Sequence, residues 1–212
     1  HRLIRRQRQM CIRDSQMTGD AEFNEVYFTD ARVSDSERLG KAGDGWRVCL
    51  LSLMNERVAI GGAQAPRGSG PIGESLRLWS ELGSHQKSVA LQDRLMSLWS
   101  KAEVARLTNI RASQNRATGV PGPEGSTGKR AFAENNKEIH EFNMELLGAS
   151  AMLYGSYEIE RSAKAMGAGS TQQQFLRSRA NSIEGGTSEV MRNILGELSL
   201  IHISEPTRQA EI

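Results

Sequence analysis

A short segment near the C-terminal end of the chain has the residue types of a ligand-binding loop. Residues 179–192 read RANSIEGGTSEVMR, in which a Gly185-Gly186 pair stands before the start of an amphipathic pattern. Paired glycines permit positive φ angles and let a backbone come close to a ligand. Thr187 or Ser188 can cap the helix that follows, and main-chain N–H groups at such a helix start suit an anionic or carbonyl-bearing ligand. An ordinary capped loop has the same pattern, so the segment alone leaves both interpretations open.

Histidines and known motifs elsewhere give no support for metal or nucleotide chemistry. His85 and His140 lack metal-ligand companions at suitable spacing, so each is expected to be a hydrogen-bonded or solvated histidine. We find no HExxH, no P-loop, no dinucleotide-binding GxGxxG unit and no pair of Glu-x-x-His motifs. The sequence therefore predicts no metal site and argues against a di-iron bundle.

Both ends of the chain resemble translated sequencing-library adapters. Residues 10–14, MCIRD, and residues 198–202, LSLIH, back-translate to DNA strings that are reverse complements of each other, give or take one overhanging base. Inverted transposon ends around a DNA fragment produce that relation, and the two ends of a natural protein have no reason to show it. Residues 1–15 and 198–212 are therefore excluded as non-native tails, although a basic targeting or nucleic-acid arm is the competing interpretation of residues 1–15.

Removing these tails changes what the composition implies. Residues 1–15 hold five arginines and one aspartate, and residues 198–212 hold one arginine and two glutamates, so residues 16–197 carry a net charge of −1 rather than +2. A nucleic-acid partner therefore loses its main support. Cys49 is then the single cysteine, which excludes an intrachain disulfide and favours a reducing, cytoplasmic compartment. No apolar run approaches the length of a membrane span.

Hydrophobic periodicity predicts a bundle of helices. Apolar residues recur at three- and four-residue spacing in residues 46–61, 72–82, 89–117 and 129–147, with a resumption over 159–166 and a last helix after the opening segment. Long helices with short connections are typical of an antiparallel four- or five-helix bundle. We expect the apolar stripes, with Trp79 and Trp99, to form its core rather than a cofactor site.

Residues 23–33, FNEVYFTDARV, follow a different pattern. Their apolar residues, which alternate partly with polar ones, are Phe23, Val26, Phe28 and Val33. This pattern predicts a strand, or a strand pair with a turn near Thr29-Asp30. So little sheet is not stable alone, and its partners are expected upstream of this chain.

Four segments resemble acyl-CoA dehydrogenases in the correct order. They are residues 23–33, residues 40–62 (GKAGDGWRVCLLSLMNERVAIGG), residues 123–149 (PEGSTGKRAFAE…IHEFNMELLGA) and residues 179–197 (RANSIEGGTSEVMRNILGE). The resemblance covers essentially all of residues 19–197. It implies a mainly α fold, an up-down helical bundle over residues 42–197, preceded over residues 16–41 by a short β remnant of the family's middle domain and a joint.

The resemblance also implies a flavin-dependent oxidoreductase. Family members use bound FAD to oxidise an acyl-CoA thioester to the trans-2-enoyl-CoA, work as homo-oligomers (dimers or tetramers) and pass electrons to electron-transfer flavoprotein. A carboxylate takes the α-proton while the β-hydrogen leaves as hydride to the flavin. A desolvated carboxylate with a raised pKa meets that need.

Site positions follow from the family's motifs, residue by residue. Gly185 stands where many members carry the catalytic Glu, so the base is expected at Glu56 on the first helix, as in a minority of the family, with Glu184 as the alternative. Arg57 aligns with an Arg that lies near the acyl-CoA or the base. The positions that approach FAD are Gly185, Gly186, Thr187 and Glu189. Without the resemblance, Glu56 and Arg57 would be interpreted as surface residues of an amphipathic helix.

Departures from the family bear on what the chain does by itself. The Arg-x-x-Phe-Gly segment has no counterpart around residues 67–92, and the FGGxG element is reduced to LLGAS at residues 146–150. The family's N-terminal helical domain and nearly all of its β-domain are missing, so we expect a fragment that binds FAD poorly and has no dehydrogenase activity. A non-catalytic helical bundle for assembly and a flavin-dependent acyl-CoA oxidase relative remain as alternatives.

Overall fold

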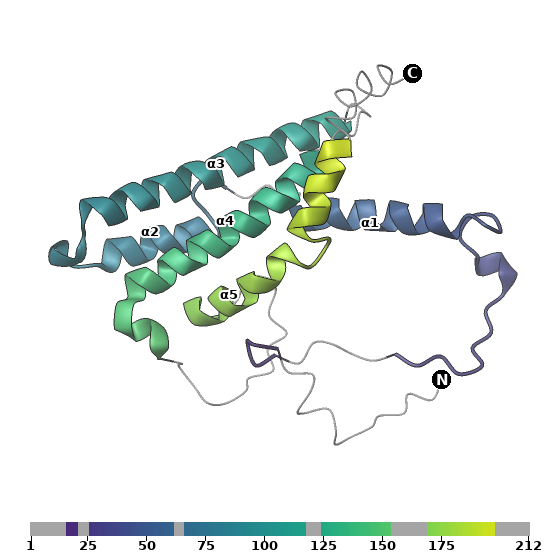
Figure 1. The fold of residues 1–212 in the computed structure, drawn as a ribbon, viewed down its shortest axis with the longest axis horizontal. Helices are drawn as coiled ribbons and strands as arrows, with labels where there is room; N and C mark the ends of the chain where they lie inside the picture. Colours follow the sequence, from purple (N-terminus) through teal and green to yellow (C-terminus); the bar gives the residue numbers. More distant parts are fainter. Residues whose placement is uncertain (1–15, 21–25, 62–65, 118–123, 154–168, 198–212) are drawn as a thin grey trace, which may run out of the picture.

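The structure is a computed structural model that describes residues 16–20, 26–61, 66–117, 124–153 and 169–197 (Figure 1). Its helices are α1 (Gly45–Gly61), α2 (Pro71–Glu81), α3 (Val89–Ala117), α4 (Glu124–Leu147) and α5 (Thr171–Ser178), followed by a helix over residues 188–197. Short 3-10 turns are η1 (Asp35–Glu37), η2 (Ser84–Gln86), η3 (Gly148–Met152) and η4 (Arg179–Ser182). The mainly α fold and the predicted helices at 46–61, 72–82, 89–117 and 129–147 are confirmed. The two terminal tails and the predicted helix at 159–166 lie outside the described residues.

The core lies between α2, α3 and α4, which run beside one another in Figure 1. Its buried members are Ile72 and Leu78 of α2, Leu95 and Leu98 of α3, and Ile139, Phe142 and Leu146 of α4. In α3 and α4 a spacing of three and four residues places each set on one face of its helix, and burial of these side chains removes apolar surface from water. Trp79 and Trp99 pack against the cluster, as predicted.

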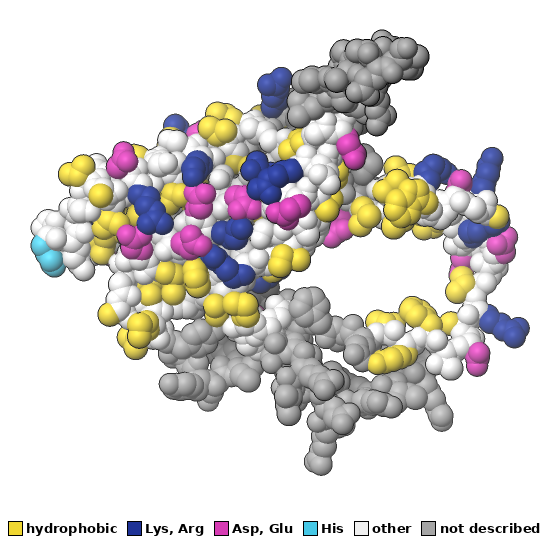
Figure 2. Space-filling view, in the orientation of Figure 1, with side chains coloured by type: hydrophobic (Ala, Val, Ile, Leu, Met, Phe, Trp, Pro, Cys, Tyr) yellow, Lys and Arg dark blue, Asp and Glu magenta, His cyan; other side chains and the backbone are white. Residues whose placement is uncertain are grey.

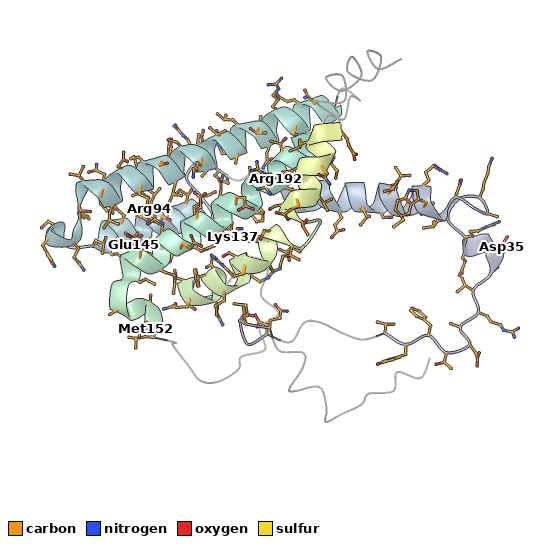
Figure 3. All side chains as sticks on the ribbon, in the orientation of Figure 1. Asp35, Arg94, Lys137, Glu145, Met152 and Arg192 are labelled. Atoms are coloured by element: carbon orange, nitrogen blue, oxygen red, sulfur yellow. The ribbon has the colours of Figure 1, made fainter. Side chains whose placement is uncertain are left out.

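α4 is the central helix, in contact with α1, α2, α3, α5 and η4. Ion pairs also join it to α3, and Figure 3 shows the pair between Arg94 of α3 and Glu145 of α4. A second pair joins Lys101 to Glu138. Exposed pairs of this kind contribute only about 0–1 kcal/mol, so the apolar cluster is the main reason that these helices pack together.

α5 was not predicted from the sequence. Its residues TQQQFLRS include only two apolar side chains, Phe175 and Leu176, and its start is fixed by polar contacts instead. The Oγ of Ser170 accepts the N–H of Gln173 at 3.2 Å, while the Gln173 side chain accepts the N–H of Ser170 at 3.0 Å. This reciprocal capping box satisfies two main-chain donors, and contact with α4 completes the helix.

The N-terminal part of α1 projects away from the other helices (Figure 1), although the helix contacts α4. Its helical periodicity is confirmed, but the apolar side chains that the structure describes on it are not core residues: Trp46 is 75% exposed, and Leu50, Leu51 and Leu53 are also exposed. Figure 2 shows apolar side chains gathered along this projecting helix. No helix among the described residues is long and apolar enough to cross a membrane.

The strand, or strand pair, predicted over residues 23–33 is corrected by the structure. Phe23 lies outside the described residues, and residues 26–34 form no strand. Val26, Phe28 and Val33 are each more than 70% exposed, although Asp30 does turn the chain, at a φ of 49°. A strand needs a neighbour to satisfy its N–H and C=O groups, and no described segment supplies one.

Residues 68–73 read GSGPIG, which has the spacing of the GxGxxG motif but not its structural context. A dinucleotide-binding turn of this type joins a strand to a helix. Here a turn at residues 66–69 leads to Gly70, which caps α2 ahead of Pro71, and no strand precedes it in the described residues. The string therefore starts a packing helix outside the context that dinucleotide binding requires.

Candidate functional site

The segment 179–192 folds into a tight turn that leads into the helix over residues 188–197. Gly185 and Gly186 have φ angles of 62° and 99°, so the predicted left-handed backbone is confirmed. The hydroxyl of Thr187 accepts the main-chain N–H three residues further on, at 3.2 Å. Thr187 is therefore the cap of the helix, which decides between the two predicted capping residues.

Space as well as backbone conformation requires glycine at position 186. A Cβ on Gly186 would lie 2.6 Å from the Cε of Met191, which is closer than real Cβ contacts come. Met191 is itself fully buried, so its side chain has little room to move away. The turn is therefore folded directly onto the first turn of the helix that it caps.

Lys129 of α4 lies beneath this turn. Its side chain is 0% exposed, and its Nζ donates hydrogen bonds to the carbonyl oxygen of Asn181, at 2.9 Å, and to that of Gly186. Burial lowers the pKa of the Lys129 ammonium, while the charges of Glu184 and Glu134 act in the opposite direction. One buried cation thus holds the turn at both of its ends.

Sequence analysis missed Lys129 because it belongs to a polar stripe of α4. Lys129, Ala133, Asn136, His140 and Asn143 recur at three- and four-residue spacing and share one face of the helix. A polar stripe on an amphipathic helix ordinarily faces water. Here α5 and η4 pack against α4, and four of these five residues are buried. One residue in the sequence could have indicated this burial: Ala133, whose small side chain lets another chain segment pack closely against that face of the helix.

Glu184 is a structural member of the turn. Both oxygens of its carboxylate accept hydrogen bonds from Arg177, at 2.7 and 3.2 Å, and Asn181 donates a third at 2.7 Å. Burial acts to raise the pKa of Glu184, but these hydrogen bonds and the charges of Arg177 and Lys129 outweigh it and the pKa is lowered. The carboxylate is therefore held in its ionised form.

The helix over residues 188–197 is tied to α4 through its first residue. Ser188 is buried, and its hydroxyl donates to Glu134 of α4 at 2.6 Å. That hydrogen bond, the bond from Lys137 and nearby positive charges overcome the burial of Glu134 and lower its pKa. Figure 3 labels Lys137 on α4 near the helix that carries Arg192. Residues 181–188 are thus joined to α4 at several points.

Glu189 stands at the exposed side of the same helix start. Its carboxylate pairs with Arg192 at 3.0 Å. Its own main-chain N–H is the largest cause that lowers the pKa of Glu189, opposed by burial and helped by the Thr187 hydroxyl and Arg192. Gly185, Gly186, Thr187 and Glu189 are therefore brought together at one helix N-terminus.

His140 is buried between α4 and its neighbours, which corrects the expectation of a satisfied or solvated histidine. Its Nδ1 has no hydrogen-bond partner in the described part of the chain. Burial, and then the positive charge of Arg179, lower the pKa of His140 to about 4, against a smaller opposite effect of Glu74. Among the described residues, no group of three or more His, Cys, Asp or Glu side chains is placed to hold a metal ion.

Glu56 and Arg57 lie on α1, a helix that contacts α4. The Glu56 side chain is exposed. Arg57 belongs to the same helix, and its side chain lies outside what the structure describes. Between described residues, no hydrogen bond or ion pair connects Glu56 to the glycine turn. The structure therefore gathers the four turn residues and leaves the predicted base on a separate, solvent-facing element.

Comparison with known proteins identifies related domains. Residues 43–200 match the family model described as acyl-CoA dehydrogenase, C-terminal domain. The acyl-CoA dehydrogenase IpdE1 of Mycolicibacterium smegmatis is 28% identical over 183 residues, which cover 86% of this chain and 43% of that protein.

Solved structures share the fold at low sequence identity. An acyl-CoA dehydrogenase from Geobacillus kaustophilus superposes with a TM-score of 0.64 at 22% identity, over 82% of this chain and 44% of that one. The Tcur3481-Tcur3483 steroid ACAD gives a TM-score of 0.62, also at 22% identity, with the same two coverages. The chain therefore spans less than half the length of these relatives.

Proposed function

The chain belongs to the acyl-CoA dehydrogenase family, and from that premise we propose that it forms part of the active site of a flavin-dependent acyl-CoA dehydrogenase. The proposed reaction oxidises an acyl-CoA thioester between Cα and Cβ to the trans-2-enoyl-CoA. Bound FAD supplies the acceptor for the hydride that leaves Cβ. The observation that carries the proposal is the fixed glycine turn of residues 185–187 at the N-terminus of a helix.

The groups of this turn fit a flavin dinucleotide. Main-chain N–H groups at a helix start, with the helix dipole behind them, favour phosphate or carbonyl oxygens. Gly185 and Gly186 carry no side chain in the way of the approach, and the Thr187 hydroxyl can donate a hydrogen bond. Glu189 is different, because an ionised carboxylate only accepts hydrogen bonds. We propose that Glu189 accepts a hydrogen bond from a hydroxyl of the cofactor and does not contact a phosphate.

Glu56 is the proposed base that takes the Cα proton, and Arg57 its electrostatic or positional neighbour. The state of Glu184 supports this choice, since a carboxylate that accepts three hydrogen bonds and has a lowered pKa is a poor proton acceptor. A base of raised pKa needs removal from water. Covering the exposed apolar side of α1 with a further domain would provide that removal for Glu56.

The remaining assignments concern the whole enzyme. We propose that its substrate is a fatty, branched or sterol side-chain acyl-CoA, and one of the structural relatives above is itself a steroid ACAD. Electron-transfer flavoprotein is the proposed electron acceptor, in a homo-oligomeric, cytoplasmic enzyme. Because the chain spans 43% of the length of IpdE1, we propose that it is a fragment that binds FAD poorly and does not turn over acyl-CoA alone.

Two measurements test these proposals. The isolated chain is mixed with FAD and an acyl-CoA in the presence of an artificial electron acceptor, and a stable yellow complex with turnover would contradict the fragment proposal. In the parent enzyme with its upstream sequence restored, Glu56→Gln is compared with Glu184→Gln. We expect Glu56→Gln to abolish turnover while flavin stays bound. Full activity of Glu56→Gln would transfer the role of base to Glu184.

A non-catalytic assembly domain is the second candidate function. The exposure of Glu56 and of the apolar side chains of α1 favours it, because an interface helix has both properties. The parent-enzyme assay separates the two candidates: an assembly domain would give no flavin binding and no dehydrogenation in the restored full-length protein.

A further inference from the structure

We propose that Lys129 is the positioning residue of the flavin-facing turn. Its buried ammonium fixes the Gly185-Gly186 backbone against α4 and so directs the N–H of Thr187 toward the ligand side. The ligand part of this inference rests on the proposed function. The positioning part concerns contacts within the described residues alone.

The burial of Lys129 calls for a reason beyond packing. It stands with Phe142 and Leu95 among the largest fully buried side chains of the described residues. Lysine is rarely buried completely, because removing an ammonium from water is costly unless hydrogen bonds and opposite charge compensate. An apolar residue would fill the same space without that cost. The useful property of Lys129 is therefore its set of N–H donors.

Those donors go to the two ends of the turn. The carbonyl of Asn181 lies at the end of η4, and the carbonyl of Gly186 lies just before the capping Thr187. Bridging both to one atom closes the intervening residues into a loop of fixed size. The bridge also satisfies two carbonyls near the centre of the fold, where water would otherwise be needed.

Peptide geometry carries this effect to the outer side of the turn. In a planar trans peptide, C=O and N–H point in opposite directions. Because the Gly186 carbonyl points inward to Lys129, the N–H of Thr187 points outward, and no described residue accepts a hydrogen bond from it. Lys129, although buried, thus orients the Thr187 N–H, a donor on the outer side of the turn.

Asn181, whose carbonyl accepts a hydrogen bond from Lys129, is also held to α4 by its side chain. The side chain of Asn181 accepts a hydrogen bond from Asn136 of α4 at 2.6 Å and donates one to Glu184 at 2.7 Å. Glu184 and Glu134 also contribute negative charge that stabilises the protonated amine. Lys129 is 0% exposed and touches no solvent, so it acts through the turn and is not a catalytic residue.

Amide hydrogen exchange on the 212-residue chain tests the positioning part without flavin. We expect Lys129→Met to speed exchange about tenfold or more at the hydrogen-bonded amides of residues 183–191, while core amides of α2–α4 keep their rates. Lys101→Met, which removes an exposed ion pair with Glu138, is the matched control and should leave the turn unchanged. If Lys129→Met does not fold, Lys129→Gln keeps a shorter neutral donor and should give an intermediate rate. Unchanged exchange at the turn in the folded variant would overturn the proposal.

FAD affinity and the flavin absorption band of the restored parent enzyme test the ligand part. Lys129→Met should weaken FAD binding about tenfold and shift the band, and Lys101→Met should do neither. Faster exchange at the turn with unaltered FAD affinity would overturn the assignment of Lys129 as a flavin-positioning residue. Wild-type enzyme that takes up no FAD would instead refute the proposed function, and the exchange result would still decide whether Lys129 fixes the turn.

Discussion

The proposed site has two parts, the glycine turn with its cofactor-facing residues and α1 with the proposed base. Contacts within this chain hold the turn in place, whereas the side chains described on α1 lack such cover. The turn is held to α4 by Lys129, by the Asn136–Asn181 hydrogen bond and by the Ser188–Glu134 hydrogen bond. α1, by contrast, exposes Trp46 and its leucines to solvent. Figure 2 shows this difference as an apolar projecting helix beside a body with mixed charge. The contacts that fix the proposed cofactor-facing turn therefore all lie within this domain. The helix with the proposed base, in contrast, needs a further protein surface to cover its exposed side chains.

The largest expected effect is on the free energy of unfolding, and it distinguishes a core substitution from one on the projecting helix α1. Phe142→Ala should lower the free energy of unfolding by about 3–5 kcal/mol, because it leaves a cavity in a fully buried cluster. Trp46→Ala on α1 should change it by less than about 0.5 kcal/mol, since the ring is 75% exposed. Urea unfolding measures both. A large loss for Trp46→Ala would mean that α1 is packed in solution, and the contrast between the two regions would fail.

A pH effect follows from His140 in the buried region. Its pKa is lowered to about 4 from the ordinary value of 6.5, so between these values the unfolded chain binds a proton that the folded chain does not. Stability should therefore fall as the pH drops from 6.5 to 4, by up to about 3 kcal/mol, and this contribution stays lost below pH 4. His140→Gln should flatten the curve of unfolding free energy against pH in this window. An unaltered curve would show that His140 does not carry the effect.

Gly186→Ala tests whether the turn is as rigid as its contacts imply. We expect a loss of about 1–3 kcal/mol, from a φ of 99° and from the contact of the new Cβ with Met191. Gly125→Ala in α4 is the control: nothing lies within 4 Å of the added Cβ, and alanine in a helix should gain about 0.5–1 kcal/mol. Thermal unfolding of both variants measures the contrast, and equal effects would contradict it.

The smallest effect compares the two candidate bases. Glu184→Gln should cost about 1–2 kcal/mol at neutral pH, because it weakens hydrogen bonds to a partly buried carboxylate. Since the pKa of Glu184 is lowered, this stabilisation is present above its ordinary value of 4.5 and is lost as the pH falls below it. Glu56→Gln on the exposed face of α1 should be neutral within about 0.5 kcal/mol. A neutral Glu184→Gln would remove the structural role assigned to that carboxylate and reopen its case as the base.

Helices were the part of the fold that sequence could predict well. α1 to α4 follow from apolar spacing and from glycine-rich breaks, both of which are local properties. α5 was missed because its stability comes from a capping box and from packing on α4 rather than from its own pattern. The predicted strand, or strand pair, does not form over the described residues 26–33 for a related reason: alternation shows how a segment would fit a sheet but not whether the sheet is present.

The candidate site divides in the same way. Gly185, Gly186 and Thr187 were identified because left-handed φ and capping select particular residue types at particular positions. Lys129 was not, because its burial depends on which segments pack against α4, and its residue type alone indicates a surface position. The flavin-binding role of Gly185, Gly186, Thr187 and Glu189 and the roles of Glu56 and Arg57 remain predictions.

By itself, the sequence determined the family resemblance, the helices of the bundle and the conformation of the glycine turn. These depend on interactions within a few residues, or on spacing along one helix. Tertiary packing, in contrast, buries a polar stripe of α4, holds Glu184 ionised through Arg177 and Asn181, and leaves Trp46 and the leucines of α1 exposed. Burial and hydrogen-bond partners depend on contacts between segments far apart in the chain, such as Lys129 and Gly186, which are 57 residues apart, and local pattern does not encode them.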